Sequence, residues 1–574
     1  MKRSRPERPA STPLAAARAH RLELALVALA AFAAFGPALR GRAFLYDDVP
    51  LIRENPYLHQ GLRTGAAALL RSGYWQASAG RAAPVAEYRP VLMLSFLLQA
   101  ATTGFSVPAM RLGNVLLHVL VCLLLWELFR RKLGPPAAFA GALIFAVLPV
   151  HSEAVGLLSG RSEVLSAAFV LGAWLALEDG RRALGFSLYA GALLSKESSV
   201  LFPVLLALDD WTFRGRRPWD EESRGLHGAL WGMTAAYLLL RFGVLADPFR
   251  GGRPYFSGRL AAALTFARFA VRHYVWPSLS GLSLCSDYSR PLIPDANPSS
   301  PSAWLPLAAW LALFAWAVRS LRRREPWAFW LIGPGLFLLP TSNLILPLDT
   351  IGAERFLYLP SVALAAGGGW LYQRLRAVRP RAAAAALGAV AAFYIAVLAR
   401  RDRVWLSPES FYRAQLACNP LSAGAAGSLG LAYLQKGDAA HGLALLETAR
   451  ALDPADPAPD YNLAKYRLSV GDAPGAESAL REALRRDPSS SDAWVLLSVV
   501  EQRNGRTEPA AAALRRALTI RPDDPKAQFD LGRLYWLRSE RERAAVHWRR
   551  FLELAPDDPD APAVRRLLRS SPEP

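Results

Sequence analysis

The sequence predicts an all-α protein in two parts, a bundle of membrane-spanning helices followed by a solenoid of short helical repeats. Two observations carry this prediction. Long apolar runs with few charges recur before about residue 400 of the 574-residue chain, which is 52% hydrophobic overall, and a helix needs about 20 apolar residues to cross a bilayer. Beyond residue 400 the chain is charged and prolines recur at a fixed spacing. The predicted domains are a basic N-terminus (1–21), a multispanning domain (22–400), a repeat array (405–558) and a C-terminal tail (559–574).

About eleven apolar segments are candidate spans. We place them at 22–40, 107–129, 137–150, 163–178, 183–195, 198–210, 226–246, 303–319, 326–346, 357–376 and 382–399. A cleaved signal peptide is the alternative for the first, but no clear small-residue cleavage site follows it. Segments 89–103 and 258–277 are better explained as helices lying in the outer membrane interface.

The basic residues indicate the orientation of these spans. The net charge of +20 could suggest a nucleic-acid partner, but the charges lie in short clusters between apolar runs, so we expect none. The clusters precede the first span and follow the second, fourth, sixth, eighth and tenth. Because cytoplasmic loops are enriched in Lys and Arg, we expect a multi-pass plasma (inner) membrane protein with a cytoplasmic N-terminus and an extracytoplasmic repeat array. A single helix over 183–209 is the alternative, and it would reverse everything downstream.

The three cysteines predict no disulfide framework. Cys122, Cys285 and Cys418 lie far apart and form no CxxC pair. Cys285 and Cys418 could pair, but the unpaired state is the favoured prediction.

The second part carries a strict 34-residue period. Small residues recur in the first helix of each predicted unit (Gly430, Ala464, Ser498, Gly532) and in the second (Gly442, Ala476, Ala510, Ala544), and prolines keep the same register (Pro420, Pro454, Pro488, Pro522, Pro556). This pattern is typical of tetratricopeptide repeats (TPRs), in which small residues allow paired helices to pack closely. Such arrays bind protein or peptide in a concave groove and are rarely catalytic, so the chemistry is expected in the membrane part.

Ionisable residues gather at the predicted outer ends of the spans, where they are costly and usually functional. They are Asp47, Asp48, Arg89, His151, Glu153, Arg161, Glu163, Lys196, Glu197, Glu354 and Arg355. A carboxylate can take a proton from an acceptor hydroxyl, while Arg and Lys stabilise phosphate charge. Structural explanations compete: Asp47–Asp48 could cap a helix, Lys196–Glu197 and Glu354–Arg355 could be ion pairs, and His151 could be an interface histidine.

In the order of these motifs the chain resembles the transmembrane and TPR-repeat-containing O-mannosyltransferases and their bacterial relatives. The matching pieces are Tyr46-Asp47-Asp48, Tyr88-Arg89-Pro90, Asn114 with His118, His151-Ser-Glu153, Gly160-Arg161-Ser-Glu163, Ser195-Lys196-Glu197, Glu354-Arg355-Phe-Leu-Tyr358 and the 34-residue repeats. Glu163 stands where Asp is common in that family, and Phe356 where Tyr is expected.

The resemblance implies a membrane domain of the GT-C type. Such enzymes carry an acidic motif in the first outer loop, here Asp47 and Asp48 as catalytic residues, and take a sugar from a polyprenyl phosphate with inversion at the anomeric carbon. The remaining ionisable residues would bind the substrate or the donor phosphate, with some of Arg89, Arg161, Lys196 and Arg355 holding the phosphate. A divalent metal ion is left open, and membrane lipids and a protein acceptor are the other expected partners.

Two further functions stay open. One is a non-enzymatic membrane scaffold that assembles envelope machinery through its TPR groove. The other keeps the chemistry but transfers sugar to a glycan or a lipid.

Overall fold

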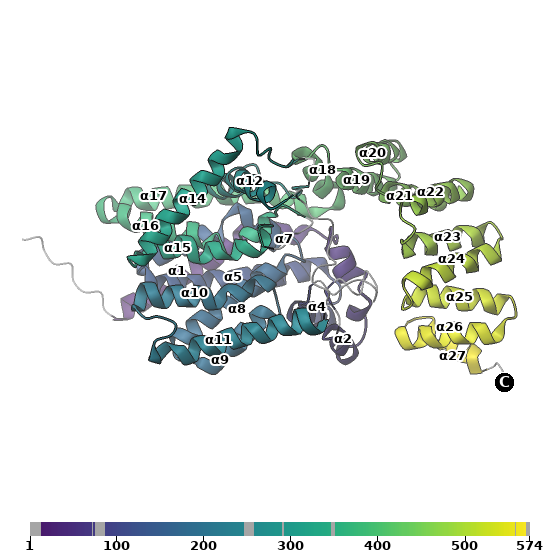
Figure 1. Ribbon diagram of the computed structural model, residues 1–574, viewed down its shortest axis with the longest axis horizontal. Helices are drawn as coiled ribbons and strands as arrows, with labels where there is room; N and C mark the ends of the chain where they lie inside the picture. Colours follow the sequence, from purple (N-terminus) through teal and green to yellow (C-terminus); the bar gives the residue numbers. More distant parts are fainter. Residues whose placement is uncertain are drawn as a thin grey trace, which may run out of the picture.

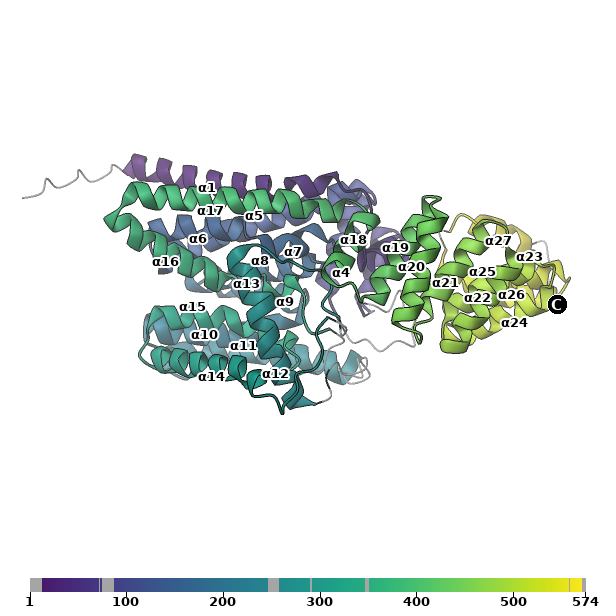
Figure 2. The same ribbon diagram turned by 90° about the horizontal axis from the view of Figure 1, so that it is seen from above.

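A computed structural model describes residues 13–71, 73–74, 87–245, 256, 258–289, 292–345, 350–556 and 558–569. Within these residues the chain forms helices and no strand, so the all-α prediction is confirmed. Helices of the membrane part run side by side, and the repeat array extends from one end of that bundle (Figure 1, Figure 2). Residues 1–12 of the predicted N-terminus lie outside the described part, and the first helix already begins at Pro13.

Every predicted span coincides with a helix. These are α1 (Pro13–Phe35), α5 (Val107–Lys132), α6 (Pro135–Ala146), α8 (Arg161–Glu178), α9 (Arg182–Leu193), α10 (Phe202–Asp209), α11 (Glu221–Leu239), α14 (Pro301–Arg322), α15 (Pro326–Gly335), α16 (Val362–Val378) and α17 (Pro380–Arg401). Shorter helices lie between them: α2 (Leu62–Leu69), α4 (Pro90–Thr103), α7 (Ser152–Gly156), α12 (Arg259–Phe269) and α13 (Trp276–Ser280). Five short 3-10 helices lie in the connections: η1 (Gly36–Arg40), η5 (Glu197–Leu201), η9 (Leu336–Thr341), η10 (Glu354–Leu357) and η11 (Asp402–Leu406).

Fewer of these helices than predicted are long and apolar enough to cross a bilayer. In the described part of the chain four qualify, in His20–Arg40, Val107–Lys132, Pro301–Arg322 and Pro380–Leu406, and a fifth is added if the pair Pro135–Ala146 and Pro149–Gly156, bent by 49°, counts as one span. The 8-residue α10 extends only about 12 Å, against a hydrocarbon core of about 30 Å. The protein is multi-pass, whereas eleven spans remains a prediction.

The predicted interruption at Lys196 is present. Lys196 has an extended backbone (φ −161°, ψ 139°) between α9 and η5, so 183–209 is not one helix. The basic clusters predicted to share one face also meet. Arg131 lies 2.6 Å from Asp179, Lys132 lies 2.6 Å from both Glu178 and Asp209, and Arg214 lies 3.3 Å from Glu178. The chain therefore reaches the same end of the bundle after α5, α8 and α10.

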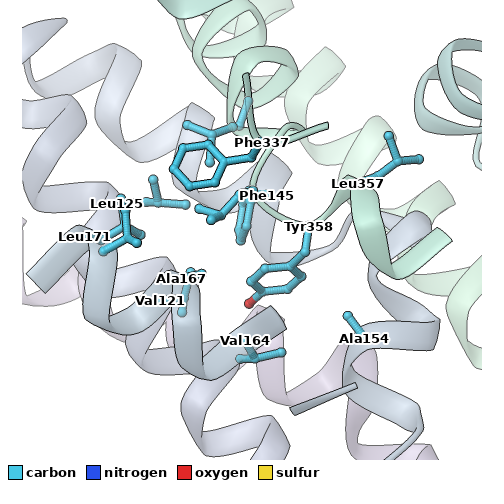
Figure 3. Close-up of a cluster of buried hydrophobic side chains, with 14 of the residues drawn as sticks. Val121, Leu125, Phe145, Ala154, Val164, Ala167, Leu171, Phe337, Leu357 and Tyr358 are labelled. Carbon is cyan, nitrogen blue, oxygen red and sulfur yellow. The ribbon is translucent and has the colours of Figure 1, made fainter. Parts of the chain in front are cut away.

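A buried apolar core fills the bundle between its two ends. Figure 3 shows part of it: α5 contributes Val121 and Leu125, α8 contributes Val164, Ala167 and Leu171, and Phe145, Phe337 and Leu357 add to the cluster. The Tyr358 side chain points into this cluster. Its hydroxyl lies 2.7 Å from Nδ1 of His118, so a polar link joins the segment after η10 to α5.

The repeat array has the predicted register. After α18 (Pro408–Cys418) come four helix pairs: α19 (Ala423–Gln435) with α20 (Ala439–Leu452), α21 (Ala458–Ser469) with α22 (Ala473–Arg486), α23 (Ser491–Arg503) with α24 (Thr507–Ile520), and α25 (Pro525–Leu537) with α26 (Arg541–Leu554). The small residues lie at the helix contacts. A Cβ on Gly430 would lie 2.9 Å from the Gly442 carbonyl oxygen, and Ala510 and Ala544 are fully buried.

The turns inside the pairs use the left-handed backbone region. Gly437, Gly471 and Gly505 have φ of 87°, 84° and 71°, and Ser539 adopts φ 63° at the equivalent position. The segment predicted as a tail differs, because it forms α27 (Ala561–Arg569). Ala561 and Val564 of α27 join a buried cluster with Trp548 and Phe551, which closes the exposed end of the last pair.

Cys285 and Cys418 form a disulfide, so the favoured prediction of unpaired cysteines is wrong. The two residues are 133 positions apart. They meet because the segment after α13 lies against the end of α18. This tertiary contact cannot be predicted from the spacing of the cysteines in the sequence. Cys122 is free and buried in α5.

Candidate functional site

Seven of the predicted site residues form one charged cluster at the end of the bundle from which the repeats extend. The charged cluster consists of Asp47, Arg89, Glu153, Glu163, Lys196, Glu197 and Arg355. They come from the loop after α1, the start of α4, α7, the first turn of α8, the break between α9 and η5, η5 itself, and η10. Segments that are far apart in sequence therefore supply the charges together.

Arg355 lies at the centre of the charged cluster. Its Nη1 is 2.5 Å from Oε1 of Glu153, and its backbone N–H donates to Oε2 of the same carboxylate at 3.0 Å. Its Nη2 faces Asp47 Oδ2 at 3.9 Å, beyond hydrogen-bond distance. With 23% of its side chain exposed, Arg355 retains donor capacity on the side that faces Asp47.

Asp47 has the properties of a general base. Its side chain is 21% exposed. Burial raises the pKa of Asp47 to about 6, since desolvation disfavours the charged carboxylate, while nearby Arg355 pulls the pKa down. Asp48 and Glu153 add like charge that also raises it. A carboxyl group with a pKa near 6 is ionised at neutral pH and is a stronger base than an ordinary aspartate.

Asp48 has a different environment, although sequence analysis treats the two aspartates alike. It is fully buried, and its carboxylate accepts the backbone N–H of Ser159 at 2.8 Å and of Leu158 at 3.3 Å. Asp48 therefore ties the acidic loop to the segment before α8. Tyr46, just before the pair, adopts φ 48°, an uncommon conformation for a residue other than glycine. Together these features fix the backbone that presents Asp47.

Lys196 and Glu163 form a buried ion pair beside a pocket. The pocket is small, with a cavity volume of about 10 Å³, and its apolar wall consists of Phe337, Phe356, Leu359 and Pro360. Phe356 separates two cations: its ring centre lies 5.1 Å from Lys196 Nζ and 5.5 Å from the Arg355 guanidinium carbon. A lysine beside apolar side chains offers both kinds of contact that a phosphate with a hydrocarbon chain would make.

Arg89 and Glu197 form the third pair. Arg89 donates through Nε and Nη2 to the Glu197 carboxylate at 2.9–3.2 Å, and it stacks over Tyr74 at 4.7 Å. Arg241, in the segment after α11, lies 3.0 Å from Glu197. Arg241 carries no signal in the sequence, because it lies within the predicted apolar segment 226–246 and no motif surrounds it.

Besides Asp48, three predicted site residues lie outside the charged cluster. Arg161 is buried and donates to Asn114 Oδ1 at 2.7 Å, Gln99 Oε1 at 2.6 Å and the Met110 carbonyl at 2.8 Å, so it joins α8 to α4 and α5. His151 is buried with Nε2 2.8 Å from Ser361 Oγ. The hydrogen bonds of these two residues link separate segments of the bundle, which favours a structural role.

Glu354 is also fully buried. It accepts the Cys285 N–H at 2.5 Å and lies 3.3 Å from Arg401 Nη2. Burial raises the pKa of Glu354 to about 7, against the opposing charge of Arg401. Glu354 therefore anchors the segment from which its neighbour Arg355 reaches the charged cluster.

The first helix after the bundle lies beside the acidic loop. Phe411 of α18 is 6.1 Å from the Tyr46 ring, and it shares a buried apolar cluster with Leu45, Leu157 and Trp405. Helix α18, at the start of the repeat array, is thus packed against the loop that carries Asp47.

Family models match both parts of the chain. Residues 89–235 match the model described as "Dolichyl-phosphate-mannose-protein mannosyltransferase", and 461–525 and 501–559 match the "Tetratricopeptide repeat" model. The human protein O-mannosyl-transferase TMTC1 is 26% identical over 473 residues, which cover 70% of this chain and 51% of that protein. Mouse TMTC4 is 26% identical over 454 residues, covering 66% of this chain and 60% of that protein.

The chain is similar in sequence to the TMTC protein O-mannosyl-transferases. The predicted resemblance is thereby confirmed for both parts of the chain. The chain spans about half to three fifths of the length of these two curated relatives. Among solved structures, the crystal structure of MamA matches 25% of this chain and 85% of that chain, with 22% identity and a TM-score of 0.23.

Proposed function

We propose that this chain is a membrane glycosyltransferase. It moves a sugar, with mannose as the first candidate, from a polyprenyl-phosphate donor to a hydroxyl group of a protein acceptor. The observation that carries the proposal is the pairing of Asp47 with Arg355 in a partly open cluster beside an apolar pocket. The relatives' names support a protein acceptor and mannose, and the repeat array supports an extended polypeptide partner.

The proposed reaction is a single displacement of the GT-C type. Asp47 takes the proton of the acceptor hydroxyl as its oxygen forms a bond to the anomeric carbon of the donor. The bond between that carbon and the phosphate oxygen breaks, and polyprenyl phosphate leaves with the electron pair. Attack from the face opposite the leaving phosphate inverts the anomeric configuration.

The cations of the charged cluster would hold the leaving phosphate. Arg355 is the best placed, because its Nη2 has no partner within hydrogen-bond distance on the side of Asp47. Lys196 lies beside Phe337, Phe356 and Leu359, apolar side chains that would contact the first isoprene units. Preorganised donors aimed at developing charge are the largest single source of rate enhancement in many enzymes.

A metal ion is a separate matter. Within the residues that the structure describes, no group of three or more His, Cys, Asp or Glu side chains could hold one. We therefore name no metal ligands and assign every step to side chains of the charged cluster.

The array would bring the acceptor to Asp47. Phe411 and Tyr412 of α18 are the first array residues near the acidic loop, and the Asp47 charge contributes, after burial, to raising the pKa of Tyr412. A polypeptide held along the repeats and emerging at α18 would present its hydroxyl beside the base. We place this reaction on the extracytoplasmic side of the membrane, since the basic clusters lie at the opposite end of the bundle.

The donor class is tested with purified protein in liposomes. Labelled mannose is supplied either as polyprenyl-phosphate mannose or as a nucleotide sugar, with proteins of a membrane extract as acceptors. We expect label in protein only from the lipid donor. No transfer from either donor would favour the scaffold function, and label in lipid or glycan alone would favour the other alternative.

The phosphate-binding role has a matched pair of variants. Arg355→Gln should raise the KM for the lipid donor about 10- to 100-fold, because a hydrogen bond to a charged group is worth about 1.5–3 kcal/mol. Arg53→Gln, at an exposed arginine of the loop that carries Asp47, should leave it unchanged. Equal donor KM values in both variants would remove Arg355 from the donor site.

A further inference from the structure

Helix α18 contacts the loop that carries Asp47 and the segment that binds Glu354. At its first turns, Phe411 is buried with Leu45 and Leu157. Leu45 lies two residues before Asp47, and Leu157 adjoins the backbone N–H groups that bind Asp48. The start of α18 is therefore packed against the acidic side of the site.

The other end of α18 is fastened to residues 285–289, the segment after α13. Three contacts hold it there besides helix packing. Cys418 forms the disulfide with Cys285, the Gln415 side-chain amide donates to the Ser286 carbonyl at 3.2 Å, and the Asn419 amide donates to Ser289 Oγ at 2.8 Å. Of these, only the disulfide is covalent.

The 285–289 segment in turn holds Glu354. The Cys285 N–H donates to Glu354 Oε1 at 2.5 Å, and the Tyr288 hydroxyl donates to the same oxygen at 3.3 Å. Arg401, at the end of α17, lies 3.3 Å from Oε2. Glu354 is fully buried, so its position depends on these donors, and a buried carboxylate that loses them pays the cost of desolvation without compensation.

We infer that the Cys285–Cys418 disulfide positions Arg355 through Glu354, so that sugar transfer depends on this bond being oxidised. The chain of contacts runs from the disulfide to the Cys285 N–H, to the Glu354 carboxylate, and through one peptide bond to the guanidinium that faces Asp47. This inference rests on the proposed function. Cys285 and Glu354 are positioning residues, since neither faces the place where donor and acceptor would meet.

The chemistry of the dependence is a two-electron exchange. A dithiol reductant gives two electrons and two protons to the bond, its own sulfurs close to a cyclic disulfide, and Cys285 and Cys418 become two thiols. The free thiols no longer tie α18 to residues 285–289. Only the two neutral hydrogen bonds made by Gln415 and Asn419 then remain between these segments. Stable disulfides form in oxidising compartments, in agreement with an extracytoplasmic site.

The test compares the oxidised full-length protein with protein treated with dithiothreitol, after thiol labelling confirms that Cys285 and Cys418 are reduced. We expect the donor KM to rise about 10- to 100-fold, since a small displacement of a positioned group costs up to about 100-fold. The rate at saturating donor should change much less. Reoxidation should restore the original KM. A role limited to stability would instead lower the rate at saturation and leave KM unchanged.

Two variants serve as controls. Cys285→Ser/Cys418→Ser should show the high donor KM with or without dithiothreitol, and Cys122→Ala should respond to dithiothreitol like the unmodified chain. An identical donor KM for oxidised and reduced protein would overturn the inference.

Failure of the proposed function is distinguishable from failure of this inference. If no transfer occurs in either redox state, hydrogen exchange of the peptides spanning 350–361 is compared between the oxidised and reduced protein. Faster exchange in the reduced protein would support the positioning role without any activity. Unchanged exchange would overturn it.

Discussion

Asp47 and Asp48 are adjacent in sequence but lie in different physical environments, which suit different roles. Asp47 is partly exposed and makes one long ion pair, whereas Asp48 is buried against two backbone N–H groups. The sequence predicted that both belong to the site. It could not distinguish them, because the donors to Asp48 lie 110 residues later in the chain.

Replacement of Asp48 tests its structural role. Asp48→Ala leaves the Leu158 and Ser159 N–H groups buried without their acceptor, which should lower the free energy of unfolding by about 1–3 kcal/mol. Asp47→Ala should lower it far less. Thermal unfolding of the two detergent-solubilised variants measures this difference. Equal stabilities would show that Asp48 does not fasten the loop.

The raised pKa of Asp47 predicts a pH dependence. Because the base must be ionised, kcat/KM should rise with pH about tenfold per unit below about pH 6 and level off above it. Arg355 favours the charged carboxylate, so Arg355→Gln should move the midpoint to higher pH. A profile that is flat between pH 5 and pH 7 would contradict Asp47 as the base.

At the scale of elements, local patterns predicted most of the fold. Apolar runs located a helix for each predicted span, and the 34-residue period located all four helix pairs, because both signals depend on neighbours in sequence. Helix lengths were predicted less well, because α10 and α15 are shorter than a bilayer requires. α27 was missed because its nine residues carry three arginines and only Ala561 and Val564 are buried.

The turn of the last repeat pair predicts a stabilising substitution. Ser539 adopts φ 63° where the other repeats have glycine, a conformation that costs a non-glycine residue about 1–2 kcal/mol. Glycine loses more entropy on folding, so we expect Ser539→Gly to stabilise α25 and α26 by about 0.5–1 kcal/mol. Hydrogen exchange of these helices in the full chain measures it.

The reverse substitution is the matched control. Gly471→Ser, at φ 84° with nothing within 4 Å of its Cβ position, should destabilise α21 and α22 by a similar amount. Faster exchange in α25 and α26 of Ser539→Gly would show that the serine side chain stabilises the turn.

At the scale of the whole molecule, the two ends of the bundle differ in chemistry. One end joins Arg131, Lys132 and Arg214 to acidic partners, and the other holds the charged cluster, with α18 packed against the loop that carries Asp47. The sequence predicted which residues share each end from the alternation of spans. It did not predict the pairing inside the charged cluster, since Arg355 bonds Glu153, 202 residues away, rather than its neighbour Glu354.

The orientation of the bundle has its own test. Arg216 and Thr448 are both exposed. Each is replaced by a single cysteine in the Cys122→Ala background, with the disulfide intact. In intact cells a membrane-impermeant thiol reagent should label Thr448→Cys and leave Arg216→Cys unlabelled until the membrane is opened. Labelling of Arg216→Cys alone would place the charged cluster on the cytoplasmic side.

The central claim is that Asp47 is the base of a sugar transfer at the charged cluster, and the most direct measurement is transfer from polyprenyl-phosphate mannose by Asp47→Asn. The amide keeps the size of the side chain and removes its proton affinity, so the rate should fall about 10²- to 10⁴-fold at unchanged protein yield. Glu54→Gln, an exposed carboxylate of the same loop, should transfer at the rate of the unmodified chain. Full activity of Asp47→Asn would contradict the proposed mechanism.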